Sequence, residues 1–270
     1  MNFMIIGAQK CGTTSLAAVL NMHPELCCSI QKETHFFSKE PNWRDKLDEY
    51  HSQFNEQLPI WFEGSTTYTF YPSFNKAIVD DLYEYNPNLK FLYIVRHPIE
   101  RLVSAYKHLY ERGYLSSSFS DAIRNYPDLL NITNYYIQIK RYIDRFGTDH
   151  VLIIDFERFN NRRQLVLKEV SNFLGIDPDL FPNGISNVKL NSEETKRLDY
   201  RIDRLNLSQS LVKRFLPIIW QLVVKLRYYH PVPRSIDVSQ SDRRFIFDIL
   251  KSDLRLLREF SSTLEAWKVI

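Results

Sequence analysis

Cysteine and glycine are scarce in this sequence. Its three cysteines are Cys11, Cys27 and Cys28, too few for a disulfide framework in a chain of 270 residues. None of them has the Cys-x-x-Cys spacing typical of a zinc site, so we expect no metal. The 7 glycines exclude collagen-like and glycine-rich linker proteins. Few, unpaired cysteines are typical of a reducing compartment, and we therefore expect a cytoplasmic protein.

Long apolar runs and a strong charge imbalance are also absent. The most apolar stretch, Phe215–Leu226, is too short to span a bilayer, so membrane association is not expected. The segment Met1–Gly7 lacks the basic and apolar regions of a signal peptide, which agrees with a cytoplasmic protein. Lys and Arg total 35 against 32 Asp and Glu, a net charge of +3. This excess is too small to favour a nucleic-acid partner, and we expect none.

The residues that are present favour a folded α/β domain. Hydrophobic residues make up 44% and charged residues 25%, which allows a large core. The patterns predict buried strands at Phe3–Ile6, Trp61–Glu63, Phe91–Val95 and Val151–Ile154. They predict helices from a Thr13 or Thr14 cap to about His23, and at Asn75–Tyr85, Pro98–Glu111, Tyr135–Phe146 and Arg163–Leu174. This alternation indicates a P-loop-like parallel sheet flanked by helices.

The composition changes near Asp177, where strand signals stop. We expect a single domain over residues 1–270, with an α/β core over 1–176 and a loop and helical extension over 177–270. The segment Lys196–His230 holds eight Lys or Arg and two Asp, a charge of +6. It is read as a solvated helical face, a lid over an anionic ligand or a membrane-surface helix. A last helix, about Gln240–Phe260, is expected to pack back on the sheet.

The segment Gly7–Thr14 has the composition of an anion-binding loop between a strand and a helix. Its glycines allow a tight turn, and the N-terminus of the helix attracts phosphate. The spacing is close to a Walker A loop, but Lys10 lies inside the loop and Thr13 occupies the usual lysine position. Three classes stay open at this point: an ATP-dependent kinase that uses Asp155 after the last strand, a metal-free transferase with a phosphate-bearing donor, and a non-catalytic nucleotide-binding module.

Three motifs together resemble the family of sulfotransferases that use 3′-phosphoadenosine 5′-phosphosulfate (PAPS), in particular bacterial relatives of the heparan-sulfate enzymes. They are Ala8–Leu16 followed by His23-Pro24, similar to the phosphosulfate loop; Lys32–Phe37, similar to "KE-x-HFF"; and Tyr93–Pro98 with Arg101 and Ser104–Tyr106, similar to the 3′-phosphate segment. One departure is Gly64, in a segment where the glycosaminoglycan enzymes often carry a lysine. This departure argues against an anionic polysaccharide as the acceptor.

The resemblance implies a P-loop-like sulfotransferase fold, PAPS as donor and no required metal. The reaction passes a sulfuryl group to a hydroxyl or amine of a small-molecule, lipid or saccharide acceptor, such as a saxitoxin-type alkaloid, and releases 3′,5′-adenosine bisphosphate (PAP). We expect the protein to be a monomer or a homodimer. The implied catalytic residues are Lys10 as the cation at the departing oxygen, Glu33 as general base, and His35 as a rival base or as the group that orients Glu33. The implied donor-binding residues are Gly12, Thr13, Thr14 and Ser15 at the phosphosulfate, Arg96 and Ser104 at the 3′-phosphate, and Lys196 or Arg197 over the nucleotide.

Overall fold

The computed structural model describes residues 1–185, 235–261 and residue 264. Lys196, Arg197 and the rest of the basic segment over 196–230 lie outside these residues. Within the described part of the chain, no helix is both long enough and apolar enough to cross a membrane.

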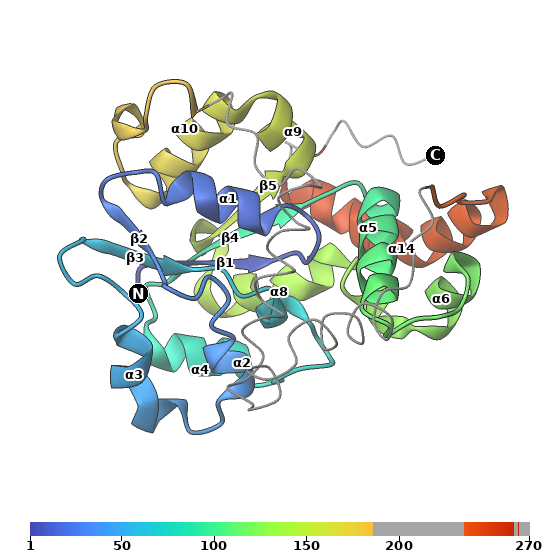
Figure 1. The fold of residues 1–270 in the computed structure, drawn as a ribbon, viewed down its shortest axis with the longest axis horizontal. Coiled ribbons are helices and arrows are strands. Elements are labelled where there is room, and N and C mark those ends of the chain that lie inside the picture. The colour runs from blue at the N-terminus through green and yellow to red at the C-terminus, as the bar shows by residue number, and fades with distance from the viewer. Residues whose placement is uncertain (186–234, 262–263, 265–270) are drawn as a thin grey trace, which may run out of the picture.

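Five parallel strands form one sheet in the order β2-β3-β1-β4-β5 (Figure 1). The strands are β1 (Phe3–Gly7), β2 (Leu26–Cys28), β3 (Ile60–Glu63), β4 (Lys90–Val95) and β5 (Val151–Asp155). All of β1 is buried, and so is all of β4 except Lys90. Central strands covered on both faces need apolar side chains at every position, which explains their unbroken apolar runs. The predicted parallel sheet is confirmed.

Helices cover both faces of the sheet, as predicted. Helices α1 (Thr13–Leu20) and α10 (Arg163–Leu174) lie on one face, and α4 (Ile78–Tyr85) and α8 (Tyr135–Phe146) lie on the other (Figure 1). The inward face of α8 places the Tyr142 ring 4.9 Å from that of Phe91 on β4. Helix α5 (Pro98–Glu111) begins directly after β4 with proline in its first turn. The predicted bounds of α5, α8 and α10 agree with the structure.

Short elements complete the described fold. They are α2 (Phe36–Lys39), η1 (Trp43–Lys46), α3 (Leu47–His51), η2 (Thr66–Thr69), α6 (Phe119–Asn125), α7 (Pro127–Asn131), η3 (Thr148–His150), α9 (Phe156–Asn161) and η4 (Pro178–Leu180). Aromatic packing joins the first of them to the core: the Phe36 and Tyr50 rings stack at 4.4 Å, and Phe37 lies 5.3 Å from Trp43. These turns are too short to show a periodic pattern in the sequence.

Two predicted helix starts need correction. Helix α1 is preceded by Gly12 at its N-cap, without a side-chain cap, so neither threonine caps it. The Thr13 hydroxyl instead accepts a hydrogen bond from Lys32. Helix α4 begins at Ile78 rather than Asn75, because the Asn75 side chain accepts a hydrogen bond from the Ala77 N–H and forms a turn there.

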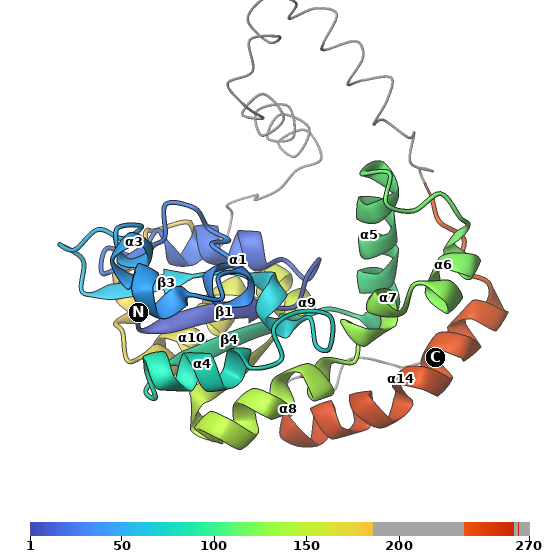
Figure 2. The same cartoon turned by 90° about the horizontal axis from the view of Figure 1, so that it is seen from below.

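The last described helix, α14 (Gln240–Phe260), has the predicted bounds, but its packing differs from the prediction. Its main contacts are with α8 and α7 rather than directly with the sheet (Figure 2). Asp253 accepts hydrogen bonds from the backbone N–H groups of Tyr136 and Ile137, both at 2.9 Å. The helix therefore caps the N-terminus of α8, where a carboxylate also meets the favourable end of the helix dipole.

Candidate active site

The loops that follow the parallel strands meet at the carboxyl edge of the sheet. The chain leaves β1 to one side for β2 and β3 and returns to the other side for β4. Such a reversal of strand order creates the crevice in which open α/β sheets bind ligands. The predicted Lys10, Glu33 and Arg96 all lie on loops at this edge, and Ser104 lies on the helix that starts there.

The loop after β1 has the tight backbone expected of an anion-binding turn. Lys10 and Gly12 both have left-handed conformations, with φ of 69° and 92°. A Cβ atom on Gly12 would lie only 2.5 Å from the Phe156 ring, so both conformation and packing demand glycine there. Helix α1 starts at the next residue, and its first N–H groups have no partner within the helix. Thr13 and Ser15 are buried, whereas Thr14 is exposed.

Lys32 connects this loop to the predicted general base. Its ammonium donates to the Thr13 hydroxyl at 3.1 Å and to Glu33 Oε1 at 2.9 Å. The loop and the Glu33 carboxylate therefore border the same space. The sequence prediction had assigned no role to Lys32, although it belongs to the quoted Lys-Glu-Thr-His-Phe-Phe motif.

Three polar groups surround the Glu33 carboxylate. Besides Lys32, the Thr66 hydroxyl donates to Oε2 at 3.3 Å, and His35 Nε2 lies 3.7 Å from the same oxygen. The side chain is one-third exposed, at 33%. A carboxylate that is oriented by neighbours and still reachable can accept the proton of an attacking hydroxyl or amine.

His35 is held rigidly beside Glu33. Its φ of 53° is left-handed, its N–H donates to Ser65 Oγ at 2.9 Å, and its Nδ1 lies 2.9 Å from Thr67 Oγ1. Burial, and to a lesser extent the nearby Lys39, lowers the pKa of the His35 imidazole. A neutral imidazole therefore persists at neutral pH, with one ring nitrogen bonded to threonine and the other directed to Glu33.

A fully buried carboxylate joins the two loops that carry these residues. Glu63 ends β3 and accepts hydrogen bonds from four hydroxyl groups. Their donors are Tyr50 at 2.8 Å, Tyr68 at 2.6 Å, Thr34 at 2.7 Å and Ser65 at 2.5 Å. Thr34 lies between Glu33 and His35, so this cluster fixes the segment that presents the base. The sequence showed only a strand that ends in glutamate.

Arg96 follows β4, where the 3′-phosphate contact was predicted. Its guanidinium lies over the Phe156 ring at 5.0 Å, bonds Glu100 at 3.3 Å and lies 4.0 Å from Glu157. Its Nε is buried and, within the described residues, has no hydrogen-bond partner. Burial raises the pKa of the Glu157 carboxyl, and the nearby Asp155 adds to this effect. Ser104 is part-exposed two turns along α5.

Arg101 and Cys11 support the phosphate loop from beneath. Arg101 is completely buried, and its guanidinium donates to the Gln9 carbonyl at 3.1 Å and the Leu129 carbonyl at 2.7 Å. Cys11 Sγ lies 3.6 Å from the Tyr135 hydroxyl, which donates to the Arg96 carbonyl at 2.9 Å. Burial raises the pKa of the Cys11 thiol to about 11, so this cysteine is a packing group rather than a nucleophile.

Asp155, the residue on which the kinase alternative depended, has a structural role. Its Oδ1 accepts a hydrogen bond from the Arg158 N–H at 2.7 Å and caps α9. One oxygen of this carboxylate is thus used locally, as in many strand-to-helix turns.

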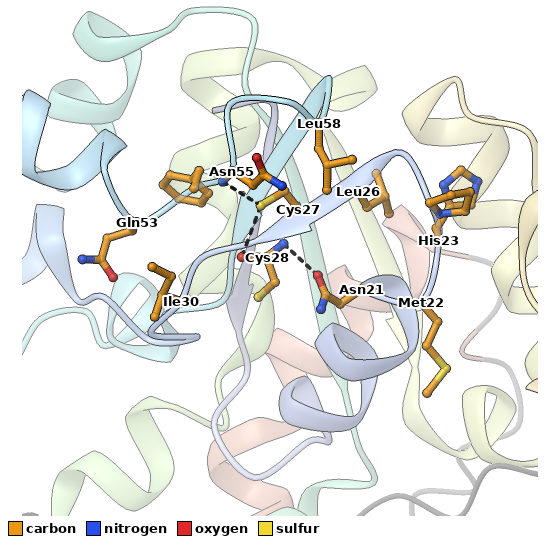
Figure 3. Close-up of a pocket in the computed structure, with 12 residues that line it drawn as sticks. Asn21, Met22, His23, Leu26, Cys27, Cys28, Ile30, Gln53, Asn55 and Leu58 are labelled. Carbon is orange, nitrogen blue, oxygen red and sulfur yellow. Dashed lines mark hydrogen bonds between the residues drawn. The ribbon is translucent and has the colours of Figure 1, made fainter.

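A pocket of about 520 Å³ lies at the outer edge of the sheet, beside β2 (Figure 3). It is lined by the end of α1, by β2 and by the loop over 53–58. Cys27, Cys28 and Ile30 belong to its lining, but none of the predicted site residues does. Burial raises the pKa of the Cys28 thiol to about 11. This pocket is therefore separate from the carboxyl-edge site.

The chain belongs to the sulfotransferase domain family, whose profile matches residues 1–198. The predicted family is thereby confirmed. Among solved structures, a sulfotransferase from Alicyclobacillus acidocaldarius is 28% identical, with a TM-score of 0.59, over 75% of this chain and 91% of that one. The sulfotransferase domain of the curacin biosynthetic pathway shares the fold at 14% identity and a TM-score of 0.51, over 93% of this chain and 97% of that one.

Similar sequences include enzymes named for heparan sulfate. The human bifunctional heparan sulfate N-deacetylase/N-sulfotransferase 2 is 25% identical over 203 residues, which cover 66% of this chain and 22% of the relative. The mouse heparan sulfate glucosamine 3-O-sulfotransferase 5 is 24% identical over 190 residues, or 65% of this chain and 53% of the relative. The chain thus spans about a fifth of the first relative and about half of the second.

Proposed function

We propose that this protein transfers the sulfuryl group of PAPS to a hydroxyl or amine and releases PAP. One observation carries the proposal: a single ammonium, that of Lys32, bonds both the phosphate-type loop and the Glu33 carboxylate. A donor bound in the loop therefore has its reactive end beside a group that can accept the acceptor's proton. The family match supports sulfuryl transfer in particular.

The chain's residues divide the chemistry between two bonds. At the bond that breaks, between sulfur and the bridging oxygen of the donor, the start of α1 and Lys10 stabilise the negative charge that develops on that oxygen. At the bond that forms, between sulfur and the acceptor atom, Glu33 accepts the proton that the acceptor loses. The neutral His35 orients Glu33, and we assign the base to Glu33 because its carboxylate is the more exposed of the two groups.

The nucleotide end of the site is assigned to Arg96 and Ser104. A phosphate dianion offers Arg96 a fork-shaped partner in place of Glu100, and the Phe156 ring keeps the guanidinium in position. Lys196 or Arg197, outside the described residues, is proposed as a further contact to the nucleotide.

The acceptor is proposed to be a small molecule, a lipid or a saccharide without dense negative charge. The heparan-sulfate names of the relatives support a saccharide, whereas Gly64 stands where a lysine would favour an anionic chain. A natural product such as a saxitoxin-type alkaloid also fits this description. We further propose a cytoplasmic monomer or homodimer.

Thermal-shift titration with PAP, ADP and ATP tests the donor assignment. We expect PAP to stabilise the protein most, because only PAP has the 3′-phosphate that Arg96 binds. Radiolabelled sulfate transfer from PAPS to a panel containing p-nitrophenol, an alkylamine and desulfated heparan oligosaccharides then tests turnover. Magnesium-dependent ATP cleavage with no response to PAP would favour the kinase. PAP binding with no transfer, unchanged in Glu33→Ala, would favour a non-catalytic module.

A further inference from the structure

Gly64 leaves room for the side chain of Lys32. A Cβ atom at position 64 would lie 2.8 Å from Lys32 Cε and 3.4 Å from its Nζ. The two residues are also joined by the backbone, because the Gly64 N–H donates to the Lys32 carbonyl at 2.9 Å. Because Gly64, on the loop after β3, has no side chain, the side chain of Lys32, on the loop after β2, has room to pass it and reach the site.

The head of Lys32 lies between the loop after β1 and the Glu33 carboxylate. Its Nζ bonds Thr13 on the donor side and Glu33 on the acceptor side, and its side chain is only 22% exposed. An ammonium has three N–H donors, and two of them have these partners in the described structure. The third donor is available to an oxygen placed between the loop and the carboxylate.

We infer that Lys32 binds the sulfonate of PAPS directly and is a second catalytic cation beside Lys10. This inference rests on the proposed function. Lys10 serves the departing oxygen, and Lys32 serves the sulfonate oxygens as the group moves from the loop toward Glu33. Gly64 permits this arrangement because it leaves room for the Lys32 side chain. The site thus has a cation from the loop after β2, although position 64 carries no lysine.

A purely structural role for Lys32 predicts a different pattern. If its ammonium only held Glu33 and the loop in place, its loss would affect every ligand of the loop alike. Direct contact with the sulfonate affects PAPS alone, because PAP has no sulfonate. The ratio of the two affinities therefore separates the two roles without any acceptor.

Calorimetric titration of Lys32→Met with PAPS and with PAP is the test. We expect PAPS affinity to fall about tenfold, as for loss of one charge-assisted hydrogen bond, while PAP affinity stays close to that of the wild type. Lys32→Arg should recover part of the loss. Lys140→Met is the matched control, because Lys140 is half-exposed on α8 and pairs with Asp144, away from the site.

Gly64→Ala provides an independent variant that leaves Lys32 in the sequence. Its methyl group displaces the Lys32 stem, so we expect the same selective loss of PAPS affinity. In the double variant Lys32→Met/Gly64→Ala, the second change should add little, because no ammonium remains to be displaced. Lys32→Met/Gly64→Lys, which places an ammonium on the other loop, should recover PAPS affinity.

The remaining outcomes of these titrations would contradict either the role of Lys32 or the proposed function. Equal losses for PAPS and PAP, unchanged PAPS affinity in Lys32→Met, or additive losses in the Lys32→Met/Gly64→Ala double variant would overturn the role of Lys32 and leave the proposed function standing. A wild-type protein that binds neither PAPS nor PAP would overturn the proposed function and this inference together.

Discussion

The two ends of the candidate site are built differently. The sulfuryl end is the part around Lys10, Lys32 and Glu33, and the nucleotide end is the part around Arg96. At the sulfuryl end, Glu33 and His35 lie on a segment anchored by the buried Glu63, which accepts four hydrogen bonds. At the nucleotide end, Arg96 is paired with the exposed Glu100, and its buried Nε lies 4.0 Å from Glu157 without a hydrogen-bond partner in the described structure. The first end is anchored by a carboxylate with four hydrogen-bond donors, and in the second Glu100 stands in for the phosphate that Arg96 is proposed to bind.

This difference indicates which step each end serves. Groups that act on a transition state gain from being fixed in advance, because no reorganisation is then needed during the reaction. A binding arginine can instead exchange one anion for another, since the protein carboxylate is replaced by a stronger, bidentate phosphate partner. We therefore expect changes at Lys10 and at the Glu63 cluster to alter mainly kcat, and changes at Arg96 to alter mainly KM.

The largest effect is expected from Lys10→Ala. Removal of a cation at the departing oxygen should lower kcat roughly 100- to 1000-fold, by analogy with loss of an oxyanion donor. PAP affinity should change much less, because the loop backbone remains. Steady-state kinetics with PAPS and calorimetry with PAP measure the two quantities. A kcat equal to that of the wild type would remove Lys10 from the reaction.

Glu63→Ala tests whether the sulfuryl end is preorganised. The change leaves the buried hydroxyl groups of Tyr50, Tyr68 and Ser65 and the part-buried hydroxyl of Thr34 without this acceptor, so the free energy of unfolding should fall by about 3 kcal/mol. Urea denaturation measures this loss, and the exposed Glu49→Ala is the control. In the folded variant, kcat should drop while PAP affinity is kept. Unchanged stability would mean that the cluster does not anchor the loops.

Arg96→Ala tests the nucleotide end. The change removes the two charge-assisted hydrogen bonds that the Arg96 guanidinium is proposed to donate to the 3′-phosphate. KM for PAPS should therefore rise roughly 10- to 100-fold, with a smaller change in kcat. Arg96→Lys should rescue little, because an ammonium cannot make the fork or stack on Phe156 in the same way. A fall in kcat at unchanged KM would reverse the assignment of the two ends.

The partly buried His35 should make stability depend on pH. Its pKa is lowered by burial relative to the usual 6.5, so the unfolded chain takes up the proton first as the pH falls. The contribution of His35 is thus fully present above about pH 6.5 and declines below it. Urea midpoints across this range should fall less steeply for His35→Asn than for the wild type. Equal slopes would show that His35 takes up its proton equally readily in both states.

The smallest effect is expected from Glu100→Gln. This change removes the carboxylate that competes with the 3′-phosphate for Arg96, so PAP should bind about two- to fivefold more tightly, the size of an exposed ion pair. Glu111→Gln, at the far end of α5, is the control. Weaker PAP binding in Glu100→Gln would show that Glu100 positions Arg96 instead of competing with the ligand.

Much of the fold followed from local patterns. Unbroken apolar runs such as Phe91–Val95 and the helical periodicity of Tyr135–Phe146 are properties of contiguous residues, and the structure places both elements as predicted. The start of α1 was mistaken because the Thr13 hydroxyl is engaged by Lys32, nineteen residues away. Local propensity cannot show such a competitor.

The candidate site was predictable only in outline. The positions of Lys10, Glu33 and Arg96 at strand ends follow from a parallel sheet, since all its carboxyl ends lie on one edge. The anchoring role of Glu63 and the packing of the Lys32 side chain against Gly64 could not be predicted from the sequence. Each depends on side chains from different loops that meet only when the sheet is assembled.

The sequence alone determined the parallel α/β architecture, the anion-binding turn and the membership of the family, because these depend on residue type and spacing along one stretch of chain. Only the tertiary structure decided that Phe156 lies against Gly12, that Lys32 joins the loop to Glu33 and that Arg96 is held by Glu100 and Phe156. Apart from the Arg96–Glu100 and Lys32–Glu33 pairs, these are contacts between distant segments. Their geometry is set by the order and twist of the strands that carry them.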